Sequence, residues 1–200
     1  YRSNPNGSHV TFTGEPCSKT RKYERGEDGV FESDLPLETR VLTDIYLEDD
    51  EPSEGHRLVF FDIEVSMEDN LPNVETANNK ITSIALYDQI TDEYHVLALD
   101  EYGSKDNYDK DNTYVKFFSA EYDLLSFFLD LWEGINPTII TGWNTNYFDV
   151  PYLYRRLTEV LGRGQANRLS SINKVKFSKY RKKYQIAGIS SLDYLDLYRK

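Results

Sequence analysis

Apolar and polar residues follow two different periods along the chain from residue 57 onward. Four mostly apolar runs have the length and alternation of β-strands: Arg57 to Val65, Lys80 to Tyr87, Tyr94 to Leu99 and a fourth near Tyr114 to Phe118. The polar stretch 88–93 joins the second run to the third, which favours an antiparallel meander. The first half of this region therefore predicts a β-sheet.

Helical spacing begins after the fourth run. From Ser119 or Ala120, one apolar stripe recurs every three or four residues: Leu124, Leu125, Phe128, Leu131 and Trp132. A short strand, Pro137 to Thr141, comes next, and a helix is expected from Asp149 to Gly162. Strands followed by alternating helix, strand and helix predict an α/β fold with a mixed sheet flanked by helices.

Residues 1–56 differ in character, since they are rich in polar and turn-forming types such as the Asn4-Pro5-Asn6-Gly7 stretch. We predict that they are the end of an N-terminal domain plus a linker, and that residues 57–200 form the main domain. The sequence begins at Tyr1 rather than Met and ends at Lys200 within a pattern of helical spacing. We therefore expect a piece of a longer chain, with the main domain incomplete at its C-terminus.

Two carboxylates stand out on the first predicted strand. Asp62 and Glu64 are two residues apart at the end of an apolar run, so in a strand they point to the same face. Adjacent like charges on a core strand are unfavourable unless a cation neutralises them or the strand's polar face is solvated. An all-oxygen set with no His or Cys nearby favours Mg²⁺ or Mn²⁺ over zinc.

A second polar cluster follows the Pro137 to Thr141 strand. Asp149 begins the next helix, and taken alone it is most simply a helix cap. However, it completes the pattern Asn-x-x-x-Phe-Asp with Asn144 and Phe148.

With Phe-Asp-Ile-Glu at residues 61–64 and Asn-x-x-x-Phe-Asp at residues 144–149, the chain resembles the 3′–5′ proofreading exonuclease of family B DNA polymerases. The likeness is greatest to polymerases of T-even-type bacteriophages, and residues 141–152 and 191–198 share it. It extends from about Leu58 to Lys200. The resemblance implies a ribonuclease H-like exonuclease fold and a cut at the 3′-terminal phosphodiester of single-stranded DNA.

In this family two divalent ions, about 3.5–4 Å apart, clamp the scissile phosphate. The resemblance implies that Asp62 bridges both ions, Glu64 holds the one that activates water, and Asp149 holds the other. Asn144 and Phe148 would contact the terminal nucleotide, although Phe148 is equally consistent with core packing. The family's later Tyr-x-x-x-Asp motif has no counterpart, because Tyr194 is followed at the fourth place by Tyr198.

Charge is unevenly distributed along the chain. The net charge is −11, which by itself disfavours binding to a polyanion. Residues 163–183, however, carry eight basic side chains and no acidic ones, while much of the acid lies in stretches expected to be solvated, 47–51 and 100–111. Residues 174–186 alternate cations with apolar residues around a basic turn, which predicts a hairpin.

Phage relatives carry a hairpin at this place that helps to separate primer from template. The cations predicted to bind DNA are Lys179, Arg181, Lys182 and Lys183, with a solubilising surface hairpin as the alternative. Asp193 and Asp196, by contrast, are most simply explained by helix capping and surface charge, with a metal role as the alternative, and the three histidines share no metal-ligand spacing.

The single cysteine, Cys17, excludes an internal disulfide, and no apolar run is long enough for a membrane span. We therefore expect a cytoplasmic protein, in the host cell if viral, with no membrane partner. The hypothesis is a proofreading exonuclease region whose partners are single-stranded or primer-template DNA, the rest of the polymerase and a sliding clamp. Two alternatives stay open, a free-standing nuclease of the same fold and a non-catalytic nucleic-acid-binding module.

Overall fold

The structure is a computed structural model that describes residues 1–11, 13–24, 26–32, 37–47, 51, 54–67 and 71–199. The chain forms two compact units, Tyr1–Ser53 and Glu54–Lys200. In the first unit, β1 (Arg2–Ser3), β2 (His9–Val10) and β3 (Pro16–Ser18) make a small antiparallel sheet in the order β1-β3-β2. The helix α1 (Leu37–Tyr46) follows, where the sequence indicated only turns and a linker.

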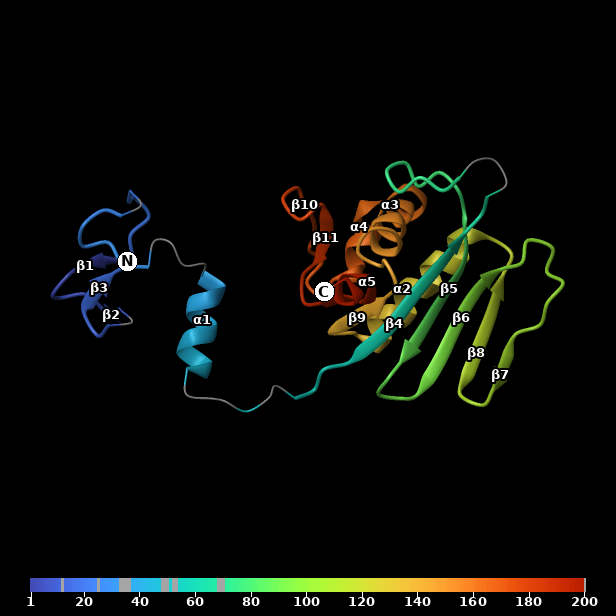
Figure 1. Cartoon of the computed structure of the whole chain (residues 1–200), viewed down its shortest axis with the longest axis horizontal. Coiled ribbons are helices and arrows are strands. Elements are labelled where there is room, and N and C mark those ends of the chain that lie inside the picture. The colour runs from blue at the N-terminus through green and yellow to red at the C-terminus, as the bar shows by residue number, and fades with distance from the viewer. Residues whose placement is uncertain are drawn as a thin grey trace. The chain divides into compact units, whose positions relative to one another are not determined.

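The second unit is built on a seven-stranded mixed sheet in the order β12-β9-β4-β5-β6-β8-β7 (Figure 1). The predicted meander is present as β4 (Leu58–Val65), β5 (Ile81–Asp88) and β6 (Glu93–Leu99), all antiparallel. The strand β8 (Thr113–Phe118) runs parallel to β6, with the short β7 (Tyr108–Lys110) at the edge. On the other side, β9 (Ile139–Gly142) is parallel to β4, and β12 (Ser190–Asp193) is parallel to β9.

Helices and a hairpin complete the second unit. The predicted helices are α2 (Glu121–Ile135) and α3 (Asp149–Leu161), and α3 is followed by the short α4 (Arg163–Ala166) and the 3-10 turn η1 (Asn167–Leu169). The predicted hairpin is formed by β10 (Val175–Ser178) and β11 (Lys183–Ile186), and the chain then passes through β12 into α5 (Tyr194–Tyr198). The α/β fold with a mixed sheet flanked by helices is thus confirmed.

The core lies on one face of β4. Phe61 packs on Phe128 and Trp132 of α2, with ring centroids 6.4 and 6.1 Å apart. Because strand side chains alternate, the buried Val59, Phe61 and Ile63 leave Asp62 and Glu64 on the opposite, exposed face. The core therefore fixes the face on which the two carboxylates lie.

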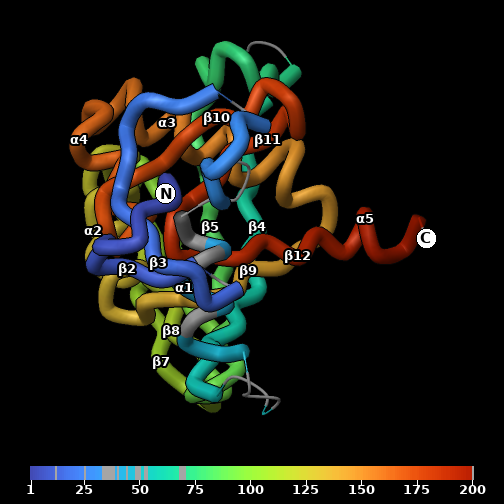
Figure 2. The backbone as a smooth tube through the Cα atoms, turned by 90° about the vertical axis from the view of Figure 1, so that its left-hand side faces the viewer, coloured from blue at the N-terminus to red at the C-terminus, as the bar shows by residue number. Residues whose placement is uncertain are grey.

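Residues 192–199 are not one helix, contrary to their spacing. Ser190–Asp193 pairs with β9 as a parallel strand, and the helix begins only at Tyr194, after Asp193 accepts a hydrogen bond from the Leu195 N–H as its cap. Figure 2 shows β12 alongside β9 with α5 continuing from it. Pairing with a neighbouring strand, which spacing does not reveal, overrides the helical pattern here.

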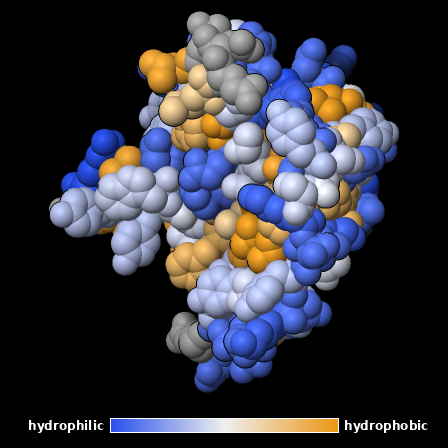
Figure 3. All heavy atoms as spheres, turned by 90° about the vertical axis from the view of Figure 1, so that its right-hand side faces the viewer, coloured by the Kyte–Doolittle hydropathy of each residue, from blue (hydrophilic) through white to orange (hydrophobic). Residues whose placement is uncertain are grey.

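The acidic stretches are only partly solvated. Asp100 is buried and accepts hydrogen bonds from the Lys105 N–H and from Ser104, so it holds its loop instead of facing water. The following residues 101–111 are exposed, and Figure 3 shows a mostly hydrophilic surface with separate apolar patches. Residues 48–50 of the other acidic stretch lie outside the described residues.

Candidate active site

The site forms where the strand β4 extends beyond the end of its neighbour β9. The two strands pair only as far as Phe60 and Thr141, so beyond them the edge of β4 is open on this side. Asp149, the first residue of α3, fills the gap, because its Oδ1 accepts a hydrogen bond of 3.0 Å from the Ile63 N–H. The helix start is thereby fixed against β4 at the residue that lies between Asp62 and Glu64.

A tight turn brings α3 to this position. Gly142 ends β9, and a Cβ atom there would lie 2.5 Å from the carbonyl oxygen of Phe61, so only glycine allows this approach. Asn144 then adopts a left-handed backbone with φ of 62°. Its carbonyl oxygen accepts the N–H groups of Tyr147 and Phe148 at 3.1 and 3.0 Å, and α3 begins directly afterwards.

Asp149 has an unusual ionisation. Burial raises its pKa to about 7, and the charges of Asp62 and Asp193 also raise it, against the lowering effect of the Ile63 N–H. Its side chain is nine-tenths or more enclosed, so the carboxylate has little water to stabilise it. In the metal-free protein this carboxyl group is therefore half protonated near neutral pH, and a cation beside it would favour the charged form.

The structure brings Asp62 and Asp149 close enough for their charges to interact, and it places Glu64 on the same exposed face of β4 as Asp62. Within the described residues, no three acidic, His or Cys side chains are already gathered as a metal site. The oxygen-only donor set suits Mg²⁺ or Mn²⁺. The assignment of Asp62, Glu64 and Asp149 as metal ligands stays a prediction.

The two candidate nucleotide contacts lie in the turn before α3. Asn144 is half-buried, and Phe148 is half-buried and stacks on Tyr152 with centroids 5.7 Å apart. Tyr152 is fully buried, so part of the Phe148 ring belongs to the core while part stays exposed. This arrangement is compatible with both contact of Phe148 with the terminal nucleotide and its packing in the core.

Asp193 has more contacts than its predicted capping role requires. Its carboxylate accepts the N–H of Leu195, as expected of a cap, and also those of Asn144 and Asn146. A helix-cap pattern was visible in the sequence, and that part is confirmed. The bonds to the turn join residues 49 and 47 positions apart, for which a single sequence gives no signal.

The basic hairpin stands beside α3. Lys179, Arg181 and Lys182 are exposed, Lys183 is half-buried, and the salt bridges of the described residues do not include these four cations. Arg168, earlier in the basic segment, is instead paired with Asp130 and Glu133. The hairpin turn therefore carries surface cations that are open to a ligand.

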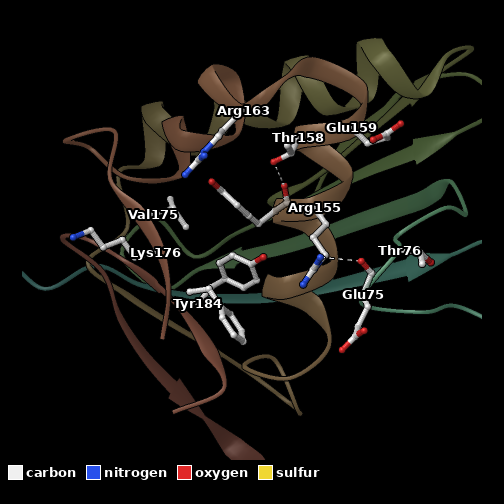
Figure 4. Close-up of a pocket in the computed structure, with 11 residues that line it drawn as sticks. Glu75, Thr76, Arg155, Thr158, Glu159, Arg163, Val175, Lys176 and Tyr184 are labelled. Atoms are coloured by element: carbon white, nitrogen blue, oxygen red, sulfur yellow. Dashed lines mark hydrogen bonds between the residues drawn. The ribbon is translucent and has the colours of Figure 1, made fainter. Parts of the chain in front are cut away.

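Two clefts border the hairpin. One of about 630 Å³ separates it from α3, and Figure 4 shows Arg155, Arg163, Lys176 and Tyr184 around it, with Arg155 donating to the carbonyl oxygen of Glu75. The other, of about 460 Å³, is lined by Arg181 and Lys183 together with Asn146 and Ser191. The second cleft thus connects hairpin cations to the turn that carries Asn144.

Comparison with known proteins identifies the family. Residues 23–200 match the exonuclease domain of DNA polymerase family B. The chain belongs to the family B DNA polymerases. The DNA-directed DNA polymerases of Escherichia phage RB69 and Enterobacteria phage T4 are 32% and 36% identical to it in alignments of 171 positions that cover 72% of this chain and 19% of each phage protein. The chain thus covers about a fifth of these relatives.

A structural relative supports the fold. The family B DNA polymerase of the archaeon Pyrobaculum calidifontis superimposes with a TM-score of 0.54 and 22% identity, over 75% of this chain and 17% of that protein. The predicted ribonuclease H-like exonuclease fold and the resemblance to phage family B polymerases are confirmed. Among the described residues, no helix is long and apolar enough to span a bilayer.

Proposed function

We propose that this chain is the proofreading part of a replicative DNA polymerase and that it hydrolyses the 3′-terminal phosphodiester of single-stranded DNA. The observation that carries the proposal is the contact of Asp149 with the Ile63 N–H, which places a buried acid beside Asp62 on an open strand edge. Residues 57–200 would form the exonuclease domain and residues 1–56 the end of another. The partners would be primer-template DNA, the rest of the polymerase and a sliding clamp, in the cytoplasm of the host cell.

The residues have separate tasks in this proposal. Asp62 and Glu64 from β4 and Asp149 from α3 would hold two Mg²⁺ or Mn²⁺ ions, which supply activation of water and stabilisation of the leaving oxygen. Asn144 would hydrogen-bond the terminal nucleotide, and the exposed part of Phe148 would pack on its sugar or base. Water adds to phosphorus, the bond to the neighbouring 3′ oxygen breaks, that oxygen takes a proton, and a nucleoside monophosphate is released.

Cleavage polarity tests the proposal. A 5′-labelled single strand treated with the full-length protein and Mg²⁺ should shorten stepwise from its 3′ end, and EDTA should stop the reaction. Residues 1–200 alone should cleave poorly, because no Tyr-x-x-x-Asp motif follows Asp149 within them. Internal cuts would indicate a structure-specific nuclease, and binding without metal-dependent cleavage would indicate a non-catalytic module. Either result would overturn the proposal.

We further propose that the hairpin cations contact the DNA backbone. Arg181 and Lys183 share a cleft with Asn146, two residues after the candidate nucleotide contact Asn144. Tyr180 at the turn is 96% exposed, so its ring is free to stack on a base, which is worth roughly 1–3 kcal/mol. A surface whose cations form none of the salt bridges of the described residues, next to an open aromatic ring, is suited to single-stranded DNA.

Replacing Lys179, Arg181, Lys182 and Lys183 together by Gln should weaken single-strand binding and flatten its salt dependence. Each phosphate that the protein no longer neutralises lowers the slope of log K against log salt by about 0.7, so four such phosphates give up to roughly 3. Fluorescence anisotropy across a salt series measures both quantities. The matched control changes four exposed lysines outside the hairpin: Lys19, Lys22, Lys105 and Lys110. An unaltered slope in the hairpin variant would leave the hairpin as a solubilising surface.

A further inference from the structure

Asp193 is a buried acid whose carboxylate is held by backbone N–H groups. Its residue is 2% exposed, and it takes part in none of the salt bridges of the described residues. Its charge is compensated by three backbone N–H groups, with Oδ1 accepting from Asn144 at 3.0 Å and Leu195 at 2.9 Å, and Oδ2 accepting from Asn146 at 2.8 Å. Two of the three belong to the turn before α3, so Asp193 does more than cap α5.

The turn held by Asp193 determines where α3 begins. Asn144 is in the left-handed region, which asparagine adopts more readily than most other residues with a Cβ atom. The carbonyl oxygen of Asn144 accepts the N–H groups of Tyr147 and Phe148, and that of Thr145 accepts the N–H of Val150. A change in the conformation of Asn144 would therefore shift the first turn of the helix.

Side-chain bonds strengthen the same connection. Asp193 is paired with Gly142 at the end of the β9–β12 ladder. Asn146 accepts a hydrogen bond of 2.7 Å from the Ser191 hydroxyl and donates a longer one, 3.4 Å, to Asp196. The β12–α5 segment is thus bonded to the turn on both sides of Thr145, and the turn leads directly to Asp149.

We propose that Asp193 is a positioning residue of the exonuclease site. It fixes the turn 143–148 so that the Asn144 side chain faces the 3′ nucleotide and the Asp149 carboxylate stays against β4. This inference rests on the proposed function. Asp193→Asn would keep one side-chain oxygen as an acceptor and replace the other by an NH₂ group, which cannot accept a hydrogen bond. Either the bond from the Asn144 N–H or the bond from the Asn146 N–H would therefore be lost.

The test compares Asp193→Asn with the unaltered full-length protein. Cleavage of single-stranded DNA at saturating DNA and Mg²⁺ should slow about 10- to 100-fold, the loss typical when a partner outside the metal ligands is removed. The Mg²⁺ concentration that gives half the maximal rate should rise. Without metal or DNA, hydrogen exchange at the Asn144 and Asn146 amides should become faster, because both lose a charged acceptor.

Two controls separate positioning from stability. Asp88 is also a buried acid that accepts a backbone N–H, from Ile90, but it pairs with Val59 near the start of β4. Asp88→Asn should lower the unfolding temperature without changing exchange in residues 143–148 or the Mg²⁺ midpoint. Asp196→Ala, which removes only the weak bond to Asn146, should cleave nearly normally. If Asp193→Asn does not fold, Asp193→Glu keeps the charge and displaces it by one methylene group, and the same losses are expected.

Unchanged cleavage and exchange in the Asp193 variants would overturn the inference, and so would equal losses in Asp88→Asn. Asp62→Ala in the same protein shows whether such a result refutes only the positioning role of Asp193 or the proposed exonuclease function as well. If Asp62→Ala stops cleavage and Asp193→Asn does not affect it, only the positioning role is wrong. If Asp62→Ala cleaves normally, the proposed function itself fails.

Discussion

Asp62→Ala in the full-length protein should abolish removal of 3′ nucleotides and leave single-strand binding nearly unchanged. The substitution takes away the carboxylate proposed to contact both metal ions. Since changing a residue outside the ligand shell already costs about 10- to 100-fold, we expect a loss of more than about 100-fold here. Single-turnover cleavage measures the first effect, and fluorescence anisotropy in EDTA measures the second.

Asp109→Ala is the matched control for this experiment. Asp109 is an exposed strand carboxylate on β7, at the opposite edge of the same sheet, and its removal makes the same change in net charge. It should cleave at the normal rate. Full activity of the Asp62→Ala protein would show that the metal site lies elsewhere.

Asp149→Asn should stabilise the metal-free protein above pH 7. Burial raises the pKa of Asp149 from 3.8 to about 7, so between these values the folded state holds a proton that the unfolded state has released. Stability from this group is complete below pH 3.8 and is lost as the pH rises to 7, by about 4 kcal/mol in all. Asn keeps an oxygen that can accept the Ile63 N–H, and it carries no charge.

Urea unfolding at pH 4 and pH 8 in EDTA measures this effect. The variant should match the unaltered protein at pH 4 and exceed it by a few kcal/mol at pH 8. Mg²⁺ or Mn²⁺ should then stabilise the unaltered protein far more than the variant, because a ligand that binds only the folded state adds its binding free energy. A variant that is less stable at pH 8 would contradict the raised pKa.

In the same urea assay, Asp88→Asn should change the stability in the opposite direction from Asp149→Asn. Burial alone would raise the pKa of Asp88, but hydrogen bonds from Arg57 and the Ile90 N–H outweigh it and hold this pKa below its ordinary value. The Asp88 carboxylate therefore contributes stability above its ordinary pKa, and Asp88→Asn should be less stable at pH 8.

Much of the fold could be predicted because its signals are local. The alternation along β4 and the apolar stripe of α2 depend on which residues face the core. Both patterns are visible in the sequence of a single strand or helix. The strand β12 could not be predicted in this way. Its four residues are held by pairing with β9, about fifty positions earlier, while the following residues have helical spacing.

The candidate site also combines features that have a local sequence signal with features that depend on long-range pairing. The two-residue period placed Asp62 and Glu64 on one face, and a helix start was visible at Asp149. That Asp149 reaches β4 depends on β9 ending early and on the close approach at Gly142, which are properties of the assembled sheet. The bonds of Asp193 to the turn likewise arise only after β12 has joined β9.

The central claim is that Asp62, Glu64 and Asp149 together hold two divalent ions at the 3′ end of DNA. Anomalous diffraction from crystals of the full-length protein with Mn²⁺ and a single strand ending in a cleavage-resistant phosphorothioate tests it most directly. We predict two manganese peaks about 3.5–4 Å apart beside the terminal phosphorus, with Asp62 touching both. Manganese bound away from these carboxylates, with the DNA end elsewhere on the protein, would contradict the claim.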